Sequence, residues 1–509
     1  MMRFTDNILN TITMYKLVLY ELLFLLVVAA VLGVFGLVPY GPLMLAYGAV
    51  LLFVTSCVMN WIFAYFFAAP TNPESTYITA LILALIITPP TGFFDPSYFA
   101  LAGWAAAWSV ASKYIFSIRK KHIFNPAAVG VAIPALFLGQ AASWWVGTPW
   151  MLPAVAVGGF LVARKIRRLD MVGAFIASAI ASVVLLSSGG AAGILHSAQQ
   201  ALLYAPLLFL GTVMLTEPMT TPPTRFWRLW YAVLVGFLFA PQVHIGSFYF
   251  TPELALLAGN ILVYVVSPKV KLLLRLKNRI KLSPDTYEFV FETKQKLKFS
   301  AGQYLEWTLA HAHADSRGIR RYFTIASSPL DPDFRIGVKF YDHASTFKKS
   351  LLSMKKGDPI VASQLAGDFT LPQDTKKKLV FIAGGIGVTP FRSMLEYLLE
   401  KKERRDIILL YSNKTTEDAA YVELLDRAER ELGIQTLPIF TNQTPAQAQE
   451  SGYPYTIDAA LIQSCIPDYA SRTFYLSGPS GMVHVYGDLL RTVGVARNRI
   501  KKDFFPGFA

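Results

Sequence analysis

The chain has 509 residues, of which 54% are hydrophobic and only 16% are charged. Soluble proteins normally carry about a quarter charged residues, so this composition excludes an ordinary soluble enzyme. Two cysteines are too few for an iron–sulfur cluster held by four thiolates or for a disulfide framework.

Charged residues are unevenly distributed along the chain. Residues 1–266 hold twelve Lys or Arg and seven Asp or Glu, whereas residues 267–509 hold thirty-five and twenty-six. We therefore predict a polytopic α-helical membrane domain over 1–266, followed by a soluble half. The positive residues of the first half lie in short loops between apolar segments, so membrane orientation explains the net charge of +14 and no nucleic-acid partner is expected.

Ten apolar segments are expected to span the lipid membrane. If the N-terminus is cytoplasmic, all twelve positive residues of 1–266 fall on the cytoplasmic side. An even number of spans places the soluble half there too, which predicts a multi-pass protein of a bacterial inner (plasma) membrane. Several segments are shorter than the roughly 20 residues that a span needs, so broken helices are expected. The segments are 17–38, 43–68, 76–90, 97–115, 123–139, 150–163, 171–187, 201–216, 229–246 and 252–266.

A short sequence repeat suggests internal symmetry in this half. Thr88-Pro89-Pro90-Thr91 ends the third span and Thr221-Pro222-Pro223-Thr224 follows the eighth. Two sets of five spans run in opposite directions, as in the inverted repeats of many transporters. Because Pro-Pro stops a helix and frees carbonyl groups, a site between the repeats is predicted near Thr88, Pro89 and Thr221. Two unrelated helix ends are the alternative.

Three segments of the first half resemble the RnfD/NqrB family of membrane flavoprotein subunits: residues 77–84, Phe124–Gly130 and Leu215–Thr220. The resemblance implies a membrane site that includes Asn125, Pro126, Thr216 and Glu217. Family members attach FMN to the Thr of an Ala-Thr dipeptide, which this chain lacks. We therefore expect no covalent FMN, and a non-covalent FMN or riboflavin, or a quinone, remains open. Glu21 and Glu217 are either part of an ion path or solvated helix ends.

Residues 267–374 show the alternating pattern of short strands and predict an antiparallel β-barrel. Arg321-Tyr322-Phe323-Thr324-Ile325-Ala326-Ser327 resembles the flavin motif of the ferredoxin–NADP reductase superfamily. A guanidinium suits the flavin pyrophosphate, and a hydroxyl suits the reactive N5, so Thr324 is a candidate catalytic residue. This resemblance implies an FAD site formed by Arg321, Tyr322, Phe323, Thr324, Ser327, Val338, Lys339, Tyr341, Ser345 and Thr346.

Residues 375–509 alternate strands and helices and predict an α/β NAD(P)-binding domain. A buried strand runs into a glycine-rich turn and a helix, where backbone amides approach a pyrophosphate. In the same superfamily three strand ends surround the nicotinamide nucleotide, and Ser477 replaces the usual Cys beside it as a second candidate catalytic residue. An aromatic residue near the C-terminus covers the flavin there. The residues implied are Gly384, Gly385, Gly387, Thr389, Pro390, Tyr411, Ser412, Gly478, Pro479, Met482 and Phe505.

Together these features predict a membrane-bound oxidoreductase that passes electrons from NADH or NADPH through FAD to the membrane domain. The acceptor is a quinone, a flavin or an external molecule, and other redox subunits are further candidate partners. Three histidines in residues 1–266 do not supply stacked haem ligands, which argues against a haem reductase. A redox-driven sodium or proton pump, and a transporter or channel with a redox-sensing flavin domain, stay open.

Overall fold

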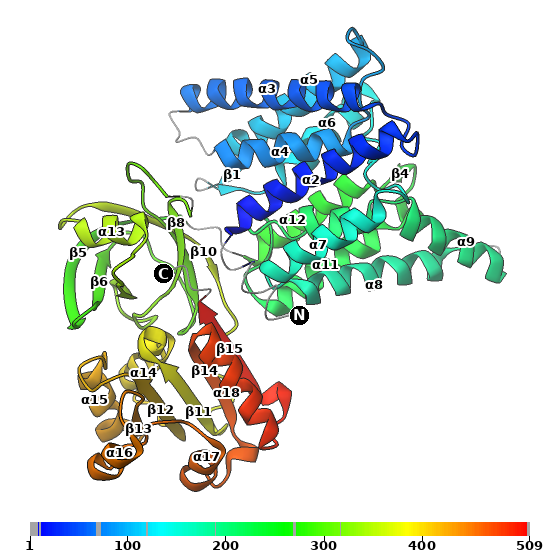
Figure 1. The fold of residues 1–509 in the computed structure, drawn as a ribbon. Coiled ribbons are helices and arrows are strands. Elements are labelled where there is room, and N and C mark those ends of the chain that lie inside the picture. The colour runs from blue at the N-terminus through cyan, green and yellow to red at the C-terminus, as the bar shows by residue number, and fades with distance from the viewer. Residues whose placement is uncertain are drawn as a thin grey trace. The chain divides into compact units, whose positions relative to one another are not determined.

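The computed structural model describes residue 9 and residues 12–67, 73–118, 121–188, 190–267, 271–315 and 317–505, without the side chains of residues 121, 504 and 505. The chain divides into two compact units, Met1–Lys269 and Val270–Ala509. The first is the helical unit and the second is the C-terminal unit, and each is considered by itself (Figure 1).

The helical unit begins with five helices: α2 (Met14–Val34), α3 (Pro42–Phe66), α4 (Pro73–Ile86), α5 (Pro96–Ile115) and α6 (Pro126–Leu138). Within this set α2 packs against α4, α3 against α5, and α5 against α6. The starts of α5 and α6 are fixed by side-chain caps, because Asp95 accepts from the N–H of Tyr98 and Asn125 from that of Ala128.

A second set follows: α7 (Leu152–Lys165), α8 (Leu169–Leu186), α9 (Gly190–Leu203), α10 (Leu207–Phe209), the π-helix η1 (Leu210–Met214), α11 (Arg225–Phe239) and α12 (Pro252–Val266). Here α7 packs against α10 and η1, α8 against α11, and α11 against α12. Two short hairpins complete the unit, β1 (Ser117–Ile118) with β2 (Lys121–His122), and β3 (His244–Ile245) with β4 (Phe248–Tyr249).

The prediction of one continuous span over 201–216 is wrong. Helix α9 fills the expected connection and ends at Leu203, and a separate, shorter helical segment begins only at Leu207. The break coincides with Pro206, which has no N–H to donate to a preceding helical turn. Because α9 and the later segment are both apolar, hydropathy alone merges them.

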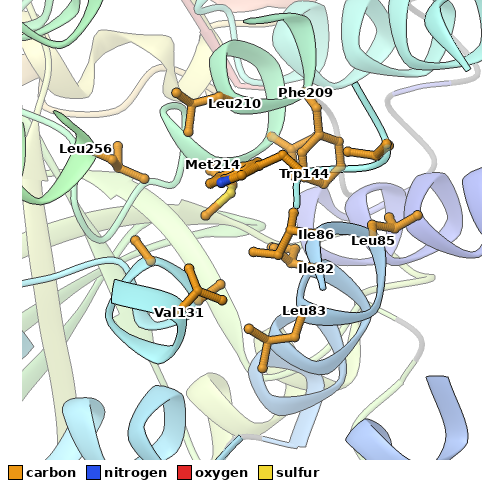
Figure 2. Close-up of a cluster of buried hydrophobic side chains, with 14 of the residues drawn as sticks. Ile82, Leu83, Leu85, Ile86, Val131, Trp144, Phe209, Leu210, Met214 and Leu256 are labelled. Atoms are coloured by element: carbon orange, nitrogen blue, oxygen red, sulfur yellow. The ribbon is translucent and has the colours of Figure 1, made fainter. Parts of the chain in front are cut away.

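Three of the described helices, α2, α3 and α8, are long and apolar enough to cross a membrane, and α4, α6 and α12 are apolar but shorter. The helical unit packs around one large apolar cluster. Figure 2 shows part of it, where Ile86 of α4, Val131 of α6, Met214 of η1 and Leu256 of α12 lie around Trp144. The first half is therefore a helical body with several apolar helices.

The C-terminal unit starts with a six-stranded antiparallel sheet in the order β8-β7-β10-β5-β6-β9. Its outer members are joined by a hydrogen bond of 2.8 Å from the N–H of Ala326 to the carbonyl of Arg335, which brings the two edges of the sheet together. Helix α13 (Thr346–Ser353) packs at its side. The strands are β5 (Leu272–Ser283), β6 (Thr286–Glu292), β7 (Tyr304–Thr308), β8 (Arg320–Thr324), β9 (Phe334–Lys339) and β10 (Pro359–Ala366).

A five-stranded parallel sheet in the order β13-β12-β11-β14-β15 forms the rest of the unit. Strands β11 and β12 are buried along their whole length, as expected for central strands covered on both faces. The carboxyl ends of β11, β12 and β14 meet at one edge, the usual ligand edge of such sheets. The strands are β11 (Leu379–Gly384), β12 (Ile407–Asn413), β13 (Gln435–Phe440), β14 (Thr473–Pro479) and β15 (Ile500–Phe505), with helices α14 (Thr389–Lys401), α15 (Val422–Leu432), α16 (Pro445–Ser451), α17 (Ala459–Cys465) and α18 (Ser480–Thr492).

Candidate functional site

Strand β8 carries two buried polar groups that the described part of the chain does not satisfy. The hydroxyl of Thr324 has no hydrogen-bond partner there, and neither have Nε and Nη2 of Arg321. Nη1 of Arg321 donates to the carbonyls of Arg317 at 2.8 Å and Arg320 at 2.6 Å, so the guanidinium is held in place. A held guanidinium with unused donors suits an anionic ligand.

Positive charge is concentrated around the start of α13. Burial, reinforced by the charges of Arg321 and Arg317, lowers the pKa of Lys348 from its usual 10.5 to about 8. Ser345 caps the helix by accepting from the N–H of Lys348, and the N–H of Thr346 points to the same region. The helix N-terminus and three cationic side chains together form a site for a phosphate group.

One carboxylate lies within this positive region. Asp315 accepts from the N–H of Thr346 at 3.1 Å and from Nη2 of Arg317 at 2.9 Å, and it lies 3.8 Å from Nη2 of Arg321. Burial raises the pKa of Asp315, but the hydrogen bonds from Thr346 and Arg317 outweigh it and hold that pKa below its ordinary value. The carboxylate is therefore ionised at neutral pH and engages donors that suit a phosphate.

Other predicted flavin residues take differing places. The ring of Phe323 packs 6.0 Å from that of Phe347, while the hydroxyl of Tyr322 donates to Glu306. The ring of Tyr341 lies 4.9 Å from the ammonium of Lys348, at the edge of the positive region.

Three further predicted flavin residues hold the fold together. Val338 is buried in the barrel core, so its side chain faces away from any ligand. Ser327 accepts from the N–H of Arg335 and helps to close the barrel. Lys339 pairs with Asp285 at 3.2 Å and Asp418 at 3.5 Å.

The glycine-rich turn follows β11 directly. Gly384 ends the strand, and Gly385 has a positive φ of 52°, which glycine adopts without strain. A Cβ on Gly387 would lie 2.4 Å from the carbonyl oxygen of Ser477, so only glycine allows this turn to pack on the end of β14. Thr389 and Pro390 then start α14, with the Thr389 hydroxyl bonded to the carbonyl of Ile386.

The neighbouring strand ends complete this edge. The hydroxyl of Ser477 is fully buried and has no hydrogen-bond partner in the described residues. Met482 lies close to both Gly384 and Gly478, whereas Pro479 is exposed. Ser412 ends β12 beside Gly384. The hydroxyl of Tyr411 is engaged by the backbone of Ala420, so this side chain orders a loop.

Phe505 belongs to β15 and pairs with Pro479, but its side chain lies outside the described residues. The C-terminal unit thus brings together Arg321, Thr324, Ser345 and Thr346 on one side, and Gly384, Gly385, Gly387, Ser412, Ser477, Gly478 and Met482 on the other.

Comparison with known proteins agrees with this geometry. Residues 381–487 match the family profile "Oxidoreductase NAD-binding domain". The C-terminal unit is a ferredoxin-reductase-like module that binds FAD and NAD(P)H.

Curated relatives include a flavohemoprotein of Bacillus subtilis, 25% identical over 42% of this chain and 53% of the relative. A Candida albicans flavohemoprotein is 33% identical over 40% of this chain and 50% of the relative. A solved cytochrome P450 reductase of Amycolatopsis aligns with 47% of this chain and 72% of that chain, at 20% identity and a TM-score of 0.42. The chain spans about half the length of the curated flavohemoproteins it matches.

The matched half is an NAD(P)H-dependent flavoprotein oxidoreductase module. Its unsatisfied polar groups fit the cofactors: the free donors of Arg321 suit the FAD pyrophosphate, and the hydroxyls of Thr324 and Ser477 suit the ring systems. The comparisons match the C-terminal half and do not extend to the RnfD/NqrB-like resemblance of the helical unit.

The helical unit holds a separate polar network at the start of α6. Nδ2 of Asn125 donates to Glu217 at 2.9 Å, and the N–H of Asn125 donates to Asn260 at 2.8 Å. Nε2 of His122 lies 3.6 Å from Glu217, and the hydroxyl of Thr220 donates to it at 3.1 Å. Glu217 is thus the common partner of segments far apart in the sequence.

A cavity of about 60 Å³ borders this network. Four of the predicted membrane-site residues line it, namely Asn125, Pro126, Thr216 and Glu217. Ser75 and Thr79 of α4 line it as well, and both bind the ammonium of Lys113. The cavity therefore has a polar end, while its remaining wall, including Val18, Ile82 and Val213, is apolar.

The prediction that the two Pro-Pro segments share this site is wrong. Thr88 and Pro89 do not line the cavity, and the carbonyls freed at the end of α4 are already bonded. The carbonyl of Ile86 accepts from the N–H of Trp144, and those of Ala84 and Ile87 accept from the indole N–H of Trp145. Thr221 is likewise absent from the cavity wall, and its hydroxyl donates to Pro218.

Several functional residues escaped prediction because their signal is tertiary. Lys348 and Asp315 carry no motif of their own, yet both lie at the start of α13. His122 and Asn260 are separated in sequence by more than one hundred residues and meet only around Asn125 and Glu217.

Proposed function

We propose that this chain is a membrane-bound flavoprotein that passes electrons from NAD(P)H, through FAD, into the helical unit and on to an acceptor. The observation that carries the proposal is the pairing of two features within one unit. Buried, unsatisfied donors of Arg321 and Thr324 lie on the flavin strand, and the glycine-rich turn of a nucleotide site opens α14. Candidate acceptors are a quinone, a second flavin or an external molecule.

The side chains act by binding and orientation. Arg321, Lys348 and the N-terminus of α13 bind the pyrophosphate of FAD, while the turn at Gly385–Gly387 gives its amides to the dinucleotide. The hydroxyls of Thr324 and Ser477 orient the two ring systems. When both cofactors are bound, a hydride leaves C4 of the nicotinamide with its electron pair, so NAD(P)H is oxidised and FAD is reduced. The reaction needs no protein nucleophile.

Two observations support a membrane role for the helical unit. Three of its described helices are long and apolar enough to cross a bilayer. Corresponding members of the two helix sets also pack in the same pairs, as inverted repeats require. We infer an RnfD/NqrB-like unit of ten spans, with the N-terminus and the FAD module in the cytoplasm of a bacterial cell.

The cavity beside Glu217 is the proposed site of the next carrier, a quinone or a non-covalent FMN or riboflavin. A second carrier is required if electrons cross, because the hydrocarbon core is about 30 Å thick. The cavity, at about 60 Å³, is smaller than the roughly 150 Å³ that admits benzene. Side chains such as Met14 and Tyr15 must therefore move when a ring enters.

The test is purification of the full chain in detergent, with a flavin count and assays of NAD(P)H oxidation. We expect FAD released on denaturation, no fluorescent band on a denaturing gel, and oxidation with quinones exceeding that with impermeant acceptors. A colourless protein that does not oxidise NADH or NADPH would refute the proposal. A fluorescent band within residues 1–266 would refute the absence of covalent FMN.

An ion pump driven by this redox step is the second candidate. Glu21 favours it, because this carboxylate is only 7% exposed within α2 and its Oε1 has no partner among the described residues. Buried acids in membrane helices often mark ion paths. NADH oxidation in sealed vesicles that accelerates with sodium, or that acidifies one side, would support pumping, and oxidation indifferent to both would exclude it.

A further inference from the structure

Two side chains of α14 join the nucleotide-binding part of the C-terminal unit to its barrel. Nη1 of Arg392 donates to the carbonyl of Ala326 at 2.7 Å, and the hydroxyl of Ser393 donates to the carbonyl of Ser327 at 2.7 Å. Arg392 is 7% exposed and Ser393 is fully buried. Both accepting carbonyls lie immediately after the flavin strand β8, within three residues of Thr324.

The same helix starts at the glycine-rich turn. Helix α14 begins at Thr389, directly after Gly385–Val388, so Arg392 and Ser393 lie in its first turns. One short rigid segment therefore carries the amides that approach the nicotinamide nucleotide and the donors that hold the flavin segment. A displacement of this segment changes the register between the two cofactor sites.

The charge of Arg392 is balanced locally. Glu288 of the barrel lies 3.6 Å from its Nε, and Glu396 of α14 lies 3.8 Å from its Nη2. Its guanidinium carbon is 5.6 Å from the centre of the Tyr421 ring. A buried guanidinium with partners on both sides of the seam is costly to shift, because any movement leaves a buried charge unpaired.

The barrel approaches the nucleotide turn most closely at Gly337 of β9. A Cβ at this position would lie 2.6 Å from the hydroxyl of Tyr421, 2.8 Å from Thr389 and 3.0 Å from Ile386. A methyl group would therefore push the two parts of the unit away from each other. The absence of a side chain sets their separation.

We propose that Arg392 and Ser393 are positioning residues for hydride transfer, and that they act with Gly337 by fixing the register between the flavin strand and the nicotinamide turn. The inference rests on the proposed function, in which one hydride oxidises NAD(P)H and reduces FAD. None of the three residues belongs to the predicted cofactor contacts. Their contribution is to geometry, and a misplacement of about 1 Å can slow a reaction on the order of 100-fold.

The test uses the full-length protein in detergent and compares wild type with Ser393→Ala, Arg392→Lys and Gly337→Ala. Exposed Ser464→Ala is the control for loss of a hydroxyl, and Gly173→Ala, which adds its methyl in open space, is the control for Gly337. Three quantities are measured without oxygen: bound FAD per chain, the Kd for NAD(P)H, and the rate of flavin reduction in stopped flow. Thermal unfolding of each variant is followed in parallel.

We expect the three variants to keep their FAD and their NAD(P)H affinity within about twofold, and to lose about 10- to 100-fold in the reduction rate. The charge-transfer absorbance of the nicotinamide–flavin complex should fall with it, while both controls match wild type. Unchanged reduction rates would overturn the inference, as would losses that merely follow lost FAD or lowered unfolding temperature. A wild-type chain whose bound FAD is not reduced by NAD(P)H would refute the proposed function itself.

Discussion

The two units differ in how their polar groups are satisfied. In the C-terminal unit, donors of Arg321, Thr324 and Ser477 are buried with unused hydrogen-bonding capacity. In the helical unit, Asn125, Glu217, Thr220 and Asn260 bond to one another in a closed network. Unused donors indicate a ligand of defined shape, whereas a closed network holds helices together and borders only a small cavity.

The contrast explains why one unit is easier to interpret than the other. A nucleotide site is built from backbone amides at strand ends, which local motifs specify. A site between helices depends on which faces meet, and this depends on the whole packing. The units should therefore respond to substitution separately, and each prediction below tests that independence.

The largest effect is expected for Arg321→Ala. Its donors to the FAD pyrophosphate are charge-assisted, and each such bond contributes about 1.5–3 kcal/mol. We expect FAD affinity to fall by about 100-fold or more, measured by flavin fluorescence on titration of the FAD-depleted chain. Exposed Arg430→Ala should retain wild-type affinity. Equal affinity in Arg321→Ala and wild type would remove the flavin site from β8.

Glu217→Gln tests the helical unit. The amide cannot accept as a charged group from Asn125, His122 and Thr220, so the cavity wall should change. We expect at least about a tenfold loss of quinone-dependent NADH oxidation, as for a weakened charged hydrogen bond, with flavin reduction in stopped flow unchanged. Glu74→Gln, at the start of α4, is the control. A parallel loss of flavin reduction would show that the units are not independent.

Much of the C-terminal unit was predictable from the sequence. The alternating pattern of residues 272–276 and the continuous apolar run of β11 each match the observed burial. The same patterns could not place Val338 or Tyr411, because a motif position does not reveal whether a side chain faces the ligand or the core. Burial direction is decided by the neighbouring strand or loop.

The helical unit shows the opposite balance. Most helix positions follow from hydropathy, but the break between α9 and α10 does not, because both segments are apolar. The Pro-Pro repeat correctly marks where α4 ends. It gave a false site because Trp144 and Trp145, distant in sequence, satisfy the carbonyls that it frees.

The pH dependence of FAD binding should reveal Lys348. Its pKa of about 8 without ligand reflects burial beside Arg321 and Arg317, and a bound pyrophosphate would raise that pKa. Below pH 8 the ammonium is charged with and without FAD, so affinity is constant. Above it, binding requires proton uptake, and Kd should rise by up to about tenfold per pH unit. Lys348→Met should bind more weakly and abolish this slope, and a slope retained in the variant would assign it to another group.

The smallest effect is expected at Asp315, the carboxylate among the donors of the phosphate site. It engages the N–H of Thr346 and the guanidinium of Arg317, and its charge opposes that of an incoming pyrophosphate. Asp315→Asn keeps an acceptor oxygen but removes the charge, so FAD should bind about fivefold more tightly, a gain of about 1 kcal/mol. Titration of the FAD-depleted chain at pH 7 measures the change, with exposed Asp374→Asn as the control. Weaker binding in Asp315→Asn would mean instead that the carboxylate orders the loop for the cofactor, and that the C-terminal unit also relies on a closed polar network.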